Sequence, residues 1–295
     1  RVKSVVIGQN NSVDKICNAI KRSRAGVTDP NKPICSLLFM GPTGVGKTHL
    51  ARSLGDILFD NNNFKQFDMS EYSEPHSISK LIGSPPGYVG YGDGGKLTEY
   101  VRHNPYCVLL FDEIEKASED IVQIFLQMLE YGNLTDSDGL EVNFKNTIII
   151  MTSNIGAYKF SKQTSLGFNS DVSVNSGVLD ELKKSYSPEF INRIDEIVIF
   201  DKLIPEVLDK IVKILLRDVK RTIKANNNTT LVLDCNIYSY ILDKNTDTDY
   251  GARPLKRVIT EYIETPLADF IIKNKLTKCK KIYVDLINNK IAFNT

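Results

Sequence analysis

The sequence predicts an α/β fold, in which a parallel sheet is covered by helices on both faces and is followed by a smaller, mainly helical domain with short strands. Three continuous apolar segments, residues 35–40, 107–111 and 147–151, are separated by helical patterns. Strands that are buried on both faces read as unbroken apolar runs, which is typical of parallel sheets. After Phe200 the pattern changes to long amphipathic helices. We therefore expect a large α/β domain at residues 1–201 and a small domain at residues 202–295.

The elements of the large domain follow from their neighbours in the chain. The first apolar run (CSLLFM) ends in a glycine-rich loop, and residues 48–59 continue with apolar residues at helical spacing. The second run (CVLLF) ends in two acids, and a helix is expected over residues 114–129. The third run (TIIIM) is followed by Thr-Ser-Asn. The carboxyl ends of the three strands thus carry glycines, acids and an amide.

The small domain is predicted by two helical patterns and two short strands. Pro205 suits the first turn of a helix, and apolar residues recur at helical spacing as far as Ile223. A second helix is expected from Arg253 toward Lys273, and residues 283–286 and 290–293 read as strands. This composition indicates a helical lid with a small sheet at its end.

Charge and hydropathy restrict the class of protein. The chain has 37 Lys and Arg against 36 Asp and Glu, which gives a formal net charge of +1. Such a balance supplies no broad positive field, so nucleic acid is not expected as a partner. No run approaches the ~18 apolar residues of a membrane span, and no membrane association is expected. Because the chain opens at Arg1 without a Met or a signal-peptide pattern, we expect a piece of a longer protein.

The cysteines and histidines show no metal-ligand spacing. We expect the five cysteines, at positions 17, 35, 107, 235 and 279, to be buried free thiols in a reducing compartment rather than disulfides or a metal site. The three histidines, at positions 49, 76 and 103, likewise do not predict a zinc site.

A phosphate-binding loop is the most specific motif in the chain. It has the pattern G-x-x-x-x-G-K-T between a buried strand and a helix, and it comprises Gly41, Pro42, Thr43, Gly44, Val45, Gly46, Lys47 and Thr48. Glycines let backbone N–H groups close around phosphate oxygens, and the helix N-terminus adds partial positive charge. Lys47 is expected to reach the β- and γ-phosphates, and the Thr48 hydroxyl to bind Mg²⁺. ATP is the expected nucleotide.

Two acids and an amide are the candidates for hydrolysis. Asp112 would hold the Mg²⁺ shell, and Glu113 would orient and polarise the attacking water. Alternatively, both acids would only cap the next helix. Asn154 follows the third strand, and its amide could contact both the water and the γ-phosphate; a turn-forming Asn is the other interpretation.

Nine strings occur in an order that resembles the second AAA+ module of the Clp unfoldases, over nearly the whole chain. They are VIGQ at 6–9, GPTGVGKT, FDMSEYSE, LIGSPPGYVGY, LLFDEIEKA, LTDSDG, FKNTIIIMTSNIG, PEFINRIDEIVIF and YGARPLKR. The resemblance implies an AAA+ large domain with a lid, ATP hydrolysis and homo-hexameric rings. It places Val6 and Ile7 in an apolar adenine pocket, Arg193 as an arginine finger acting in trans, and Arg253 as a sensor reaching from the lid.

The resemblance also assigns a substrate contact. Tyr88 and Val89 lie in a segment too rich in glycine and proline for a helix or a central strand, so a loop is expected. An aromatic residue on such a loop can simply fold back onto the domain. In the Clp family, the matching Tyr lines the axial pore and grips threaded polypeptide, which implies unfolded or tagged proteins as substrates.

A tripeptide distinguishes the two Clp branches. Leu166, Gly167 and Phe168 stand in a polar, mobile stretch expected at 161–176, and exposed apolar residues on a loop need a partner. Clp proteins that feed the ClpP peptidase carry such a tripeptide, and ClpB disaggregases lack it. The resemblance thus favours a ClpC-like unfoldase in a plastid-type stroma or a bacterial cytoplasm. A ClpB-like disaggregase, a nucleotide-dependent scaffold and a DNA-handling AAA+ protein are the alternatives.

The chain departs from the family pattern at two places. His49 follows Thr48 where the family commonly has an acid, and residues 137–141 are less basic than usual. The first is expected to tune the nucleotide site, and the second to alter contacts in the inner pore.

Overall fold

A computed structural model describes residues 1–59, 63–87, 94–162, 170–245, 247, 251–274 and 281–295, with the side chains of 161, 162 and 170–174 left aside. The chain divides into two compact units. The first comprises residues 1–42 and 46–201, and the second comprises residues 43–45 and 202–295. None of the described helices is long and apolar enough to cross a membrane.

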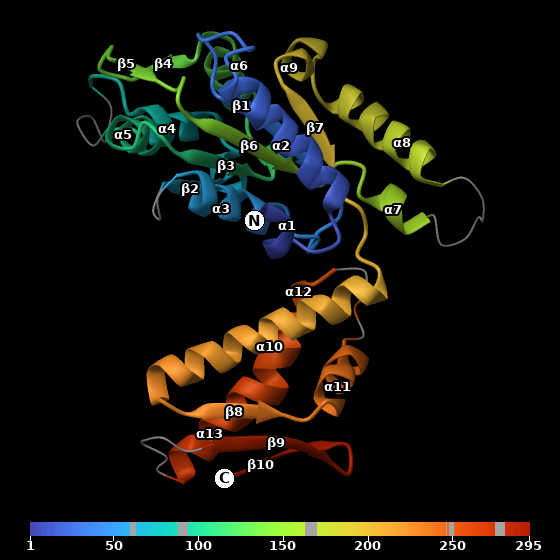
Figure 1. Cartoon of the computed structure of the whole chain (residues 1–295). Coiled ribbons are helices and arrows are strands. Elements are labelled where there is room, and N and C mark those ends of the chain that lie inside the picture. The colour runs from blue at the N-terminus through green and yellow to red at the C-terminus, as the bar shows by residue number, and fades with distance from the viewer. Residues whose placement is uncertain (60–62, 88–93, 163–169, 246, 248–250, 275–280) are drawn as a thin grey trace. The chain divides into compact units, whose positions relative to one another are not determined.

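A five-stranded parallel sheet forms the centre of the first unit (Figure 1). Its strands are β1 (Cys35–Met40), β2 (Phe64–Asp68), β3 (Val108–Asp112), β6 (Ile148–Ser153) and β7 (Glu196–Ile199), in the order β2-β3-β6-β1-β7. Every neighbouring pair is parallel. Because all five strands run the same way, their carboxyl ends share one edge of the sheet, where the phosphate-binding loop begins.

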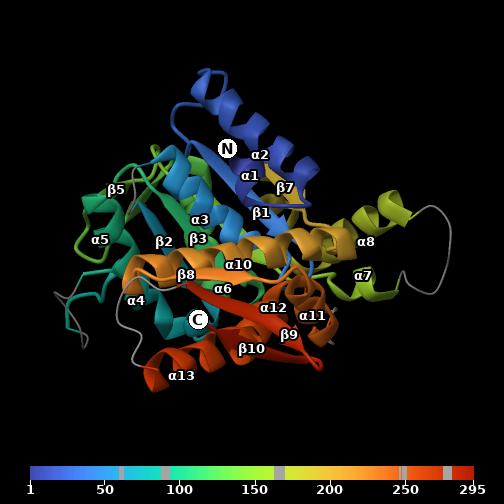
Figure 2. The same cartoon turned by 60° about the horizontal axis from the view of Figure 1, so that its bottom comes forward.

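Helices pack on both faces of this sheet, as side-chain alternation requires. On one face, α2 (Asn10–Arg24) packs against β1 and β7, and α3 (Lys47–Leu58) against β2, β3 and β6. On the other face, residues of β1, β3 and β6 pack with α5 (Lys96–His103) and α6 (Glu119–Tyr131) in one buried apolar cluster. Figure 2 shows the ribbons of these elements from a second direction. The predicted α/β class is confirmed.

Shorter elements complete the first unit. The strands β4 (Asn133–Thr135) and β5 (Glu141–Asn143) pair as a two-stranded antiparallel ribbon. The other described α-helices of this unit are α1 (Val2–Val5), α4 (Ile78–Ile82), α7 (Tyr158–Lys162), α8 (Ser170–Ser185) and α9 (Pro188–Asn192).

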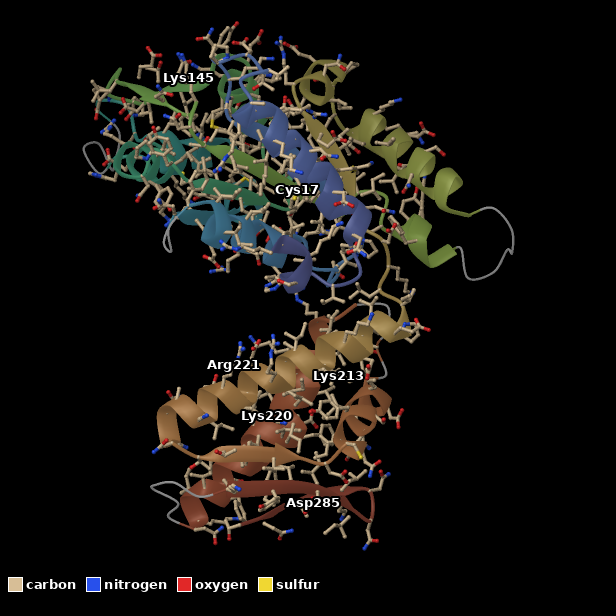
Figure 3. All side chains as sticks on the ribbon, in the orientation of Figure 1. Cys17, Lys145, Lys213, Lys220, Arg221 and Asp285 are labelled. Carbon is tan, nitrogen blue, oxygen red and sulfur yellow. The ribbon has the colours of Figure 1, made fainter. Side chains whose placement is uncertain are left out.

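The second unit is mainly helical and carries a small sheet. Its helices are α10 (Pro205–Asn227), α11 (Asn236–Lys244), α12 (Arg253–Ile259) and α13 (Thr265–Lys273), with a π-helical turn at Thr260–Glu264 between the last two. The strands β8 (Thr230–Leu233), β9 (Lys281–Ile287) and β10 (Lys290–Asn294) form a sheet in the order β10-β9-β8. In Figure 3, Lys213, Lys220 and Arg221 project from α10, and Asp285 from β9.

Several sequence expectations differ from the structure in detail. The helix predicted over residues 114–129 is a 3-10 turn at Ile114–Lys116 followed by α6, because Ala117 is extended and Ser118 is the N-cap of the longer helix. Residues 170–176, expected in a polar loop, belong to α8. Cys35 and Cys107 are buried as expected, whereas Cys17 is half-buried and Cys235 is exposed. Cys279 lies outside the described residues.

Candidate functional site

The phosphate-binding loop leaves β1 through a backbone conformation that requires glycine. Gly41 has φ +136°, and a Cβ there would lie 2.6 Å from the carbonyl oxygen of Phe200. The N–H of Phe200 donates to the Met40 carbonyl at 2.8 Å, which fixes this close approach. Gly46, the N-cap of α3, has φ +104°. Glycine is therefore needed at position 41 because a side chain would clash with Phe200, and at position 46 because the backbone φ is positive.

Lys47 is the buried cation of the site. Its side chain is only 8% exposed, and Nζ donates to the carbonyl oxygens of Gly41 and Pro42. Nζ also donates to Oδ1 of Asn154 at 2.7 Å. Burial lowers the pKa of Lys47 to about 8, and the carboxylates of Glu115, Asp112 and Glu113 oppose this shift. The buried ammonium group thus stands among acceptors that a phosphate group can replace.

Asp112, the last residue of β3, has both carboxylate oxygens engaged. Oδ2 accepts hydrogen bonds from Nε2 of Gln66 at 2.9 Å and from the hydroxyl of Thr48 at 3.4 Å. Oδ1 accepts a hydrogen bond from the hydroxyl of Thr152. The two side chains that the sequence predicts as Mg²⁺ ligands, Thr48 and Asp112, therefore lie side by side.

Glu113 follows Asp112 in a left-handed backbone conformation, with φ +59°. Its N–H donates to the Thr152 hydroxyl at 3.0 Å. Oε1 accepts a hydrogen bond from Nδ2 of Asn154 at 3.3 Å, and Oε2 forms an ion pair with Lys116. A positive φ at a residue other than glycine is uncommon and concentrates at functional sites. This conformation turns Glu113 back toward the end of β6.

Asn154 stands directly after β6 and connects the cation to the carboxylate. Its side chain accepts from Lys47 and donates to Glu113, and its backbone N–H donates to Oε1 of Glu115 at 3.0 Å. The sequence analysis missed Glu115, Thr152 and Gln66 as contributors. Glu115 lies in the turn after β3 and Thr152 near the end of β6, so nearness to the carboxyl ends of these strands could have indicated both. Gln66 lies in the middle of β2, and no signal in the sequence indicates it.

Val6 and Ile7, the predicted adenine contacts, follow α1 at the start of the chain. Val6 is 4% exposed, and its Cγ1 lies 3.9 Å from where a Cβ on Gly46 would stand. Ile7 is half-buried. An apolar side chain thus adjoins the beginning of α3, where the phosphate-binding loop ends.

Arg193 lies at the opposite edge of the sheet from Lys47. Its carbonyl oxygen accepts a hydrogen bond from the hydroxyl of Ser36, near the amino end of β1. The phosphate-binding loop begins five residues later, a distance of roughly 16 Å along a strand. The guanidinium forms an ion pair with Glu130, in the last turn of α6, at 2.6 Å. The structure therefore does not bring Arg193 to the phosphate-binding loop of its own chain.

The other predicted residues lie in the second unit or outside the described residues. Arg253 is exposed and begins α12 in the second unit. Tyr88 and Val89, the predicted substrate contacts, lie outside the described residues, as do Leu166, Gly167 and Phe168.

Comparison with protein-family models identifies both units. Residues 32–197 match the AAA domain of the Cdc48 subfamily, and residues 203–284 match the C-terminal D2-small domain of ClpB protein. The first match covers more than half of the chain. A nucleotide-binding domain of this family agrees with the group formed by Lys47, Asp112, Glu113 and Asn154.

Three curated relatives align along nearly the whole chain. "Chaperone protein ClpB" of Prochlorococcus marinus is 46% identical over 295 residues, which is 100% of this chain and 34% of the relative. "Negative regulator of genetic competence ClpC/MecB" of Bacillus subtilis is 44% identical over 299 residues (99% and 37%). "ATP-dependent Clp protease ATP-binding subunit ClpC" of Staphylococcus aureus is 46% identical over 287 residues (95% and 35%).

The chain thus spans about a third of the length of these relatives, and ClpB and ClpC proteins match it with similar identity. The AAA-domain match lies within the first structural unit, and the D2-small-domain match lies within the second. The chain belongs to the AAA+ ATPases, as a second AAA+ module of the Clp family.

Proposed function

We propose that this chain hydrolyses ATP and that a hexamer of such modules uses the energy to unfold and translocate polypeptides. One observation carries the ATPase proposal. Lys47, Asn154 and Glu113 form a continuous hydrogen-bonded chain beside the phosphate-binding loop, so a cation, an amide and a carboxylate meet at one place. These are the groups that phosphoryl transfer to water requires.

Each residue has a step in this reaction. Lys47 binds the β- and γ-phosphate oxygens, and the amide of Asn154 contacts the γ-phosphate and the attacking water. Glu113 accepts a proton from that water, whose oxygen attacks the γ-phosphorus as the bond to the bridging oxygen of ADP breaks. In the present arrangement Lys116 pairs with Glu113, so this ion pair must open before Glu113 can act as a base.

Mg²⁺ fits the oxygen ligands beside Lys47. The hydroxyl of Thr48 and Oδ2 of Asp112 are 3.4 Å apart. Mg²⁺ is bound by oxygen atoms at about 2.1 Å in octahedral geometry, which separates neighbouring ligands by about 3 Å. When bound, Mg²⁺ would neutralise charge on the phosphate oxygens. The Gln66 and Thr152 side chains hold the Asp112 carboxylate in place for this role.

We assign Arg193 to the site of a neighbouring subunit, because it lies at the opposite sheet edge from its own Lys47. An arginine supplied in trans can accelerate hydrolysis by about 10³–10⁵. Arg253 would contact the γ-phosphate from the lid, with Val6 and Ile7 against the adenine. ATPase activity per subunit should therefore rise with protein concentration. Full activity from demonstrably monomeric protein would contradict the assignment.

We place the polypeptide contact at Tyr88 and Val89. The relatives named as chaperones and as a protease's ATP-binding subunit support a protein substrate. Tyr88→Ala should retain ATP hydrolysis and lose unfolding of a tagged fluorescent substrate. Tyr106→Ala, which removes an exposed tyrosine of the same unit, is the matched control. Unchanged unfolding by the Tyr88 variant would remove Tyr88 from this role.

A ClpP-type peptidase is the proposed downstream partner, through Leu166, Gly167 and Phe168. One relative is named as an ATP-binding subunit of the Clp protease, which supports this branch, and another is named ClpB, which supports the disaggregase alternative. Retention of ClpP by assembled protein, lost in Phe168→Ala, is the expected result. No retention by the intact protein favours the disaggregase. The bacterial relatives favour a cytoplasmic location, with a plastid stroma as the other candidate.

A further inference from the structure

Glu115 has no part in the mechanism above, but it accepts a hydrogen bond from Asn154, which does. It lies in the 3-10 turn Ile114–Lys116, which follows β3 and Glu113. Its Oε1 accepts the backbone N–H of Asn154 at 3.0 Å. Since β6 ends at Ser153, this N–H lies beyond the strand, and Glu115 supplies its acceptor.

The hydrogen bond to Glu115 constrains Asn154, whose side chain must make two contacts at once. The Asn154 side chain must reach Lys47 with Oδ1, at 2.7 Å, and Glu113 with Nδ2, at 3.3 Å. Both contacts project from one Cα, so a rotation of the backbone at Asn154 moves the two together. The Glu115 contact therefore fixes the direction in which the amide is presented.

The other oxygen of Glu115 argues against a purely stabilising role. Oε2 is buried and is one of four buried side-chain polar atoms without a hydrogen-bond partner among the residues that the structure describes. An unpaired buried polar atom costs free energy, and more so when it carries charge. Because the unpaired Oε2 lowers the stability of the folded protein, stability alone does not account for Glu115. We therefore look for its role in the site.

We propose that Glu115 is a positioning residue, whose hydrogen bond to the Asn154 backbone holds the Asn154 amide where the γ-phosphate is recognised. This rests on the proposed ATPase function. Glu115 acts through Asn154, and it touches neither the nucleotide nor the attacking water. Its hydrogen bond is made by one oxygen, which an uncharged amide can replace.

The test compares Glu115→Ala with Glu115→Gln in the full chain. Glu115→Ala removes the acceptor and should lower kcat about tenfold, as the loss of one buried hydrogen bond at a site does, while the affinity for ADP stays unchanged. Glu115→Gln keeps an acceptor oxygen and should retain most of the activity. Glu119→Ala, which removes an exposed acid at the start of α6, is the control for loss of a nearby carboxylate.

A second arm tests whether Glu115 acts through Asn154. In an Asn154→Ala background, Glu115→Ala should cause no further loss of kcat. In a Glu113→Gln background, which does not turn over, Glu115→Ala should reduce the preference for ATP over ADP, because only ATP presents the γ-phosphate. Additive losses, equal losses in the Ala and Gln variants, or an unchanged ATP preference overturn the inference. Absence of both ATP binding and hydrolysis when Glu115 is intact overturns the proposed function, and the inference with it.

Discussion

The ammonium group of Lys47 lies 2.7 Å from Oδ1 of Asn154, which joins the start of α3 to the end of β6. The same amide donates to Glu113 through Nδ2. The three side chains come from the ends of three different elements, so the parallel sheet sets their spacing. Because hydrogen bonds connect the three side chains, replacing one of them removes a contact of the next. The three replacements nevertheless have different expected effects.

Replacing Lys47 should abolish tight nucleotide binding. Lys47→Ala removes the buried charge that we propose to neutralise phosphate oxygens, and charge-assisted hydrogen bonds are among the strongest polar contacts. We expect the affinity for both ATP and ADP to fall by at least about tenfold, measured by titration calorimetry. Lys65→Ala, which removes an exposed lysine from β2, is the control and should bind normally. Equal affinity in the Lys47 variant and the wild type would refute the role.

Replacing Glu113 by glutamine should separate binding from turnover. The amide retains an oxygen that can accept from Asn154, but it cannot take a proton from water. General-base catalysis contributes about 10²–10⁴-fold, so phosphate release should fall by that order while ATP binding persists. Single-turnover phosphate release measures the chemical step directly. Glu119→Gln should behave as the wild type, and rapid release from the Glu113 variant would remove Glu113 from its role.

Much of the fold could be predicted because its strands are buried on both faces. Residues 35–40 and 147–151 contain almost no polar residues, and β1 and β6 form there with all of their residues buried. The edge strands β2 and β7 were not predicted. Both are partly exposed; β2 has Lys65 and Gln66 between its apolar residues, and β7 is only four residues long. The 3-10 turn after β3 was also missed, because helical periodicity alone does not reveal the break at Ala117.

The candidate site was predictable to the extent that its residues belong to contiguous motifs. The motif around Lys47 and the acids after β3 can be identified from local sequence alone. Glu115 and Thr152 could not be assigned this way, because their contacts join the ends of different strands. Arg193 is a different case. Its family role came from resemblance, and only the sheet direction shows that it lies away from its own Lys47.

The close approach at Gly41 predicts a stability difference between two glycine substitutions. In Gly41→Ala the new methyl group meets the Phe200 carbonyl at 2.6 Å, in a backbone conformation with φ +136°. Gly26 also has a positive φ, +70°, but a Cβ there meets nothing within 4 Å. We expect Gly26→Ala to lose about 1 kcal/mol of unfolding free energy, from backbone strain alone. Gly41→Ala should lose on the order of 3 kcal/mol, because overpacking adds to strain.

Urea denaturation of both glycine variants measures this difference. The comparison controls for the general cost of alanine in the left-handed region, so the excess loss in the Gly41 variant reports the contact with Phe200 together with the greater backbone strain at φ +136°. Similar losses in the two variants would mean that the backbone of Phe200 moves away at little cost.

Replacing Arg193 should abolish turnover without weakening nucleotide binding. Because Arg193 lies at the opposite sheet edge from its own phosphate-binding loop, Arg193→Ala leaves the Lys47 site intact. Turnover in assembled protein should fall by about 10³-fold or more. Arg22→Ala removes an arginine paired with Glu196, at the same edge of the sheet, and should hydrolyse ATP normally.

Mixing two inactive variants tests the action in trans. An Arg193→Ala subunit offers an intact Lys47 site, and a Lys47→Ala subunit offers an intact arginine. Where the second presents its arginine to the first, one complete site forms, so mixed assemblies should recover part of the wild-type turnover although each variant alone has almost none. If Arg193 served its own subunit, no pairing would bring Lys47 and Arg193 together, and mixtures would stay inactive at every ratio. The recovered activity should peak at an intermediate ratio, because only unlike neighbours complete a site.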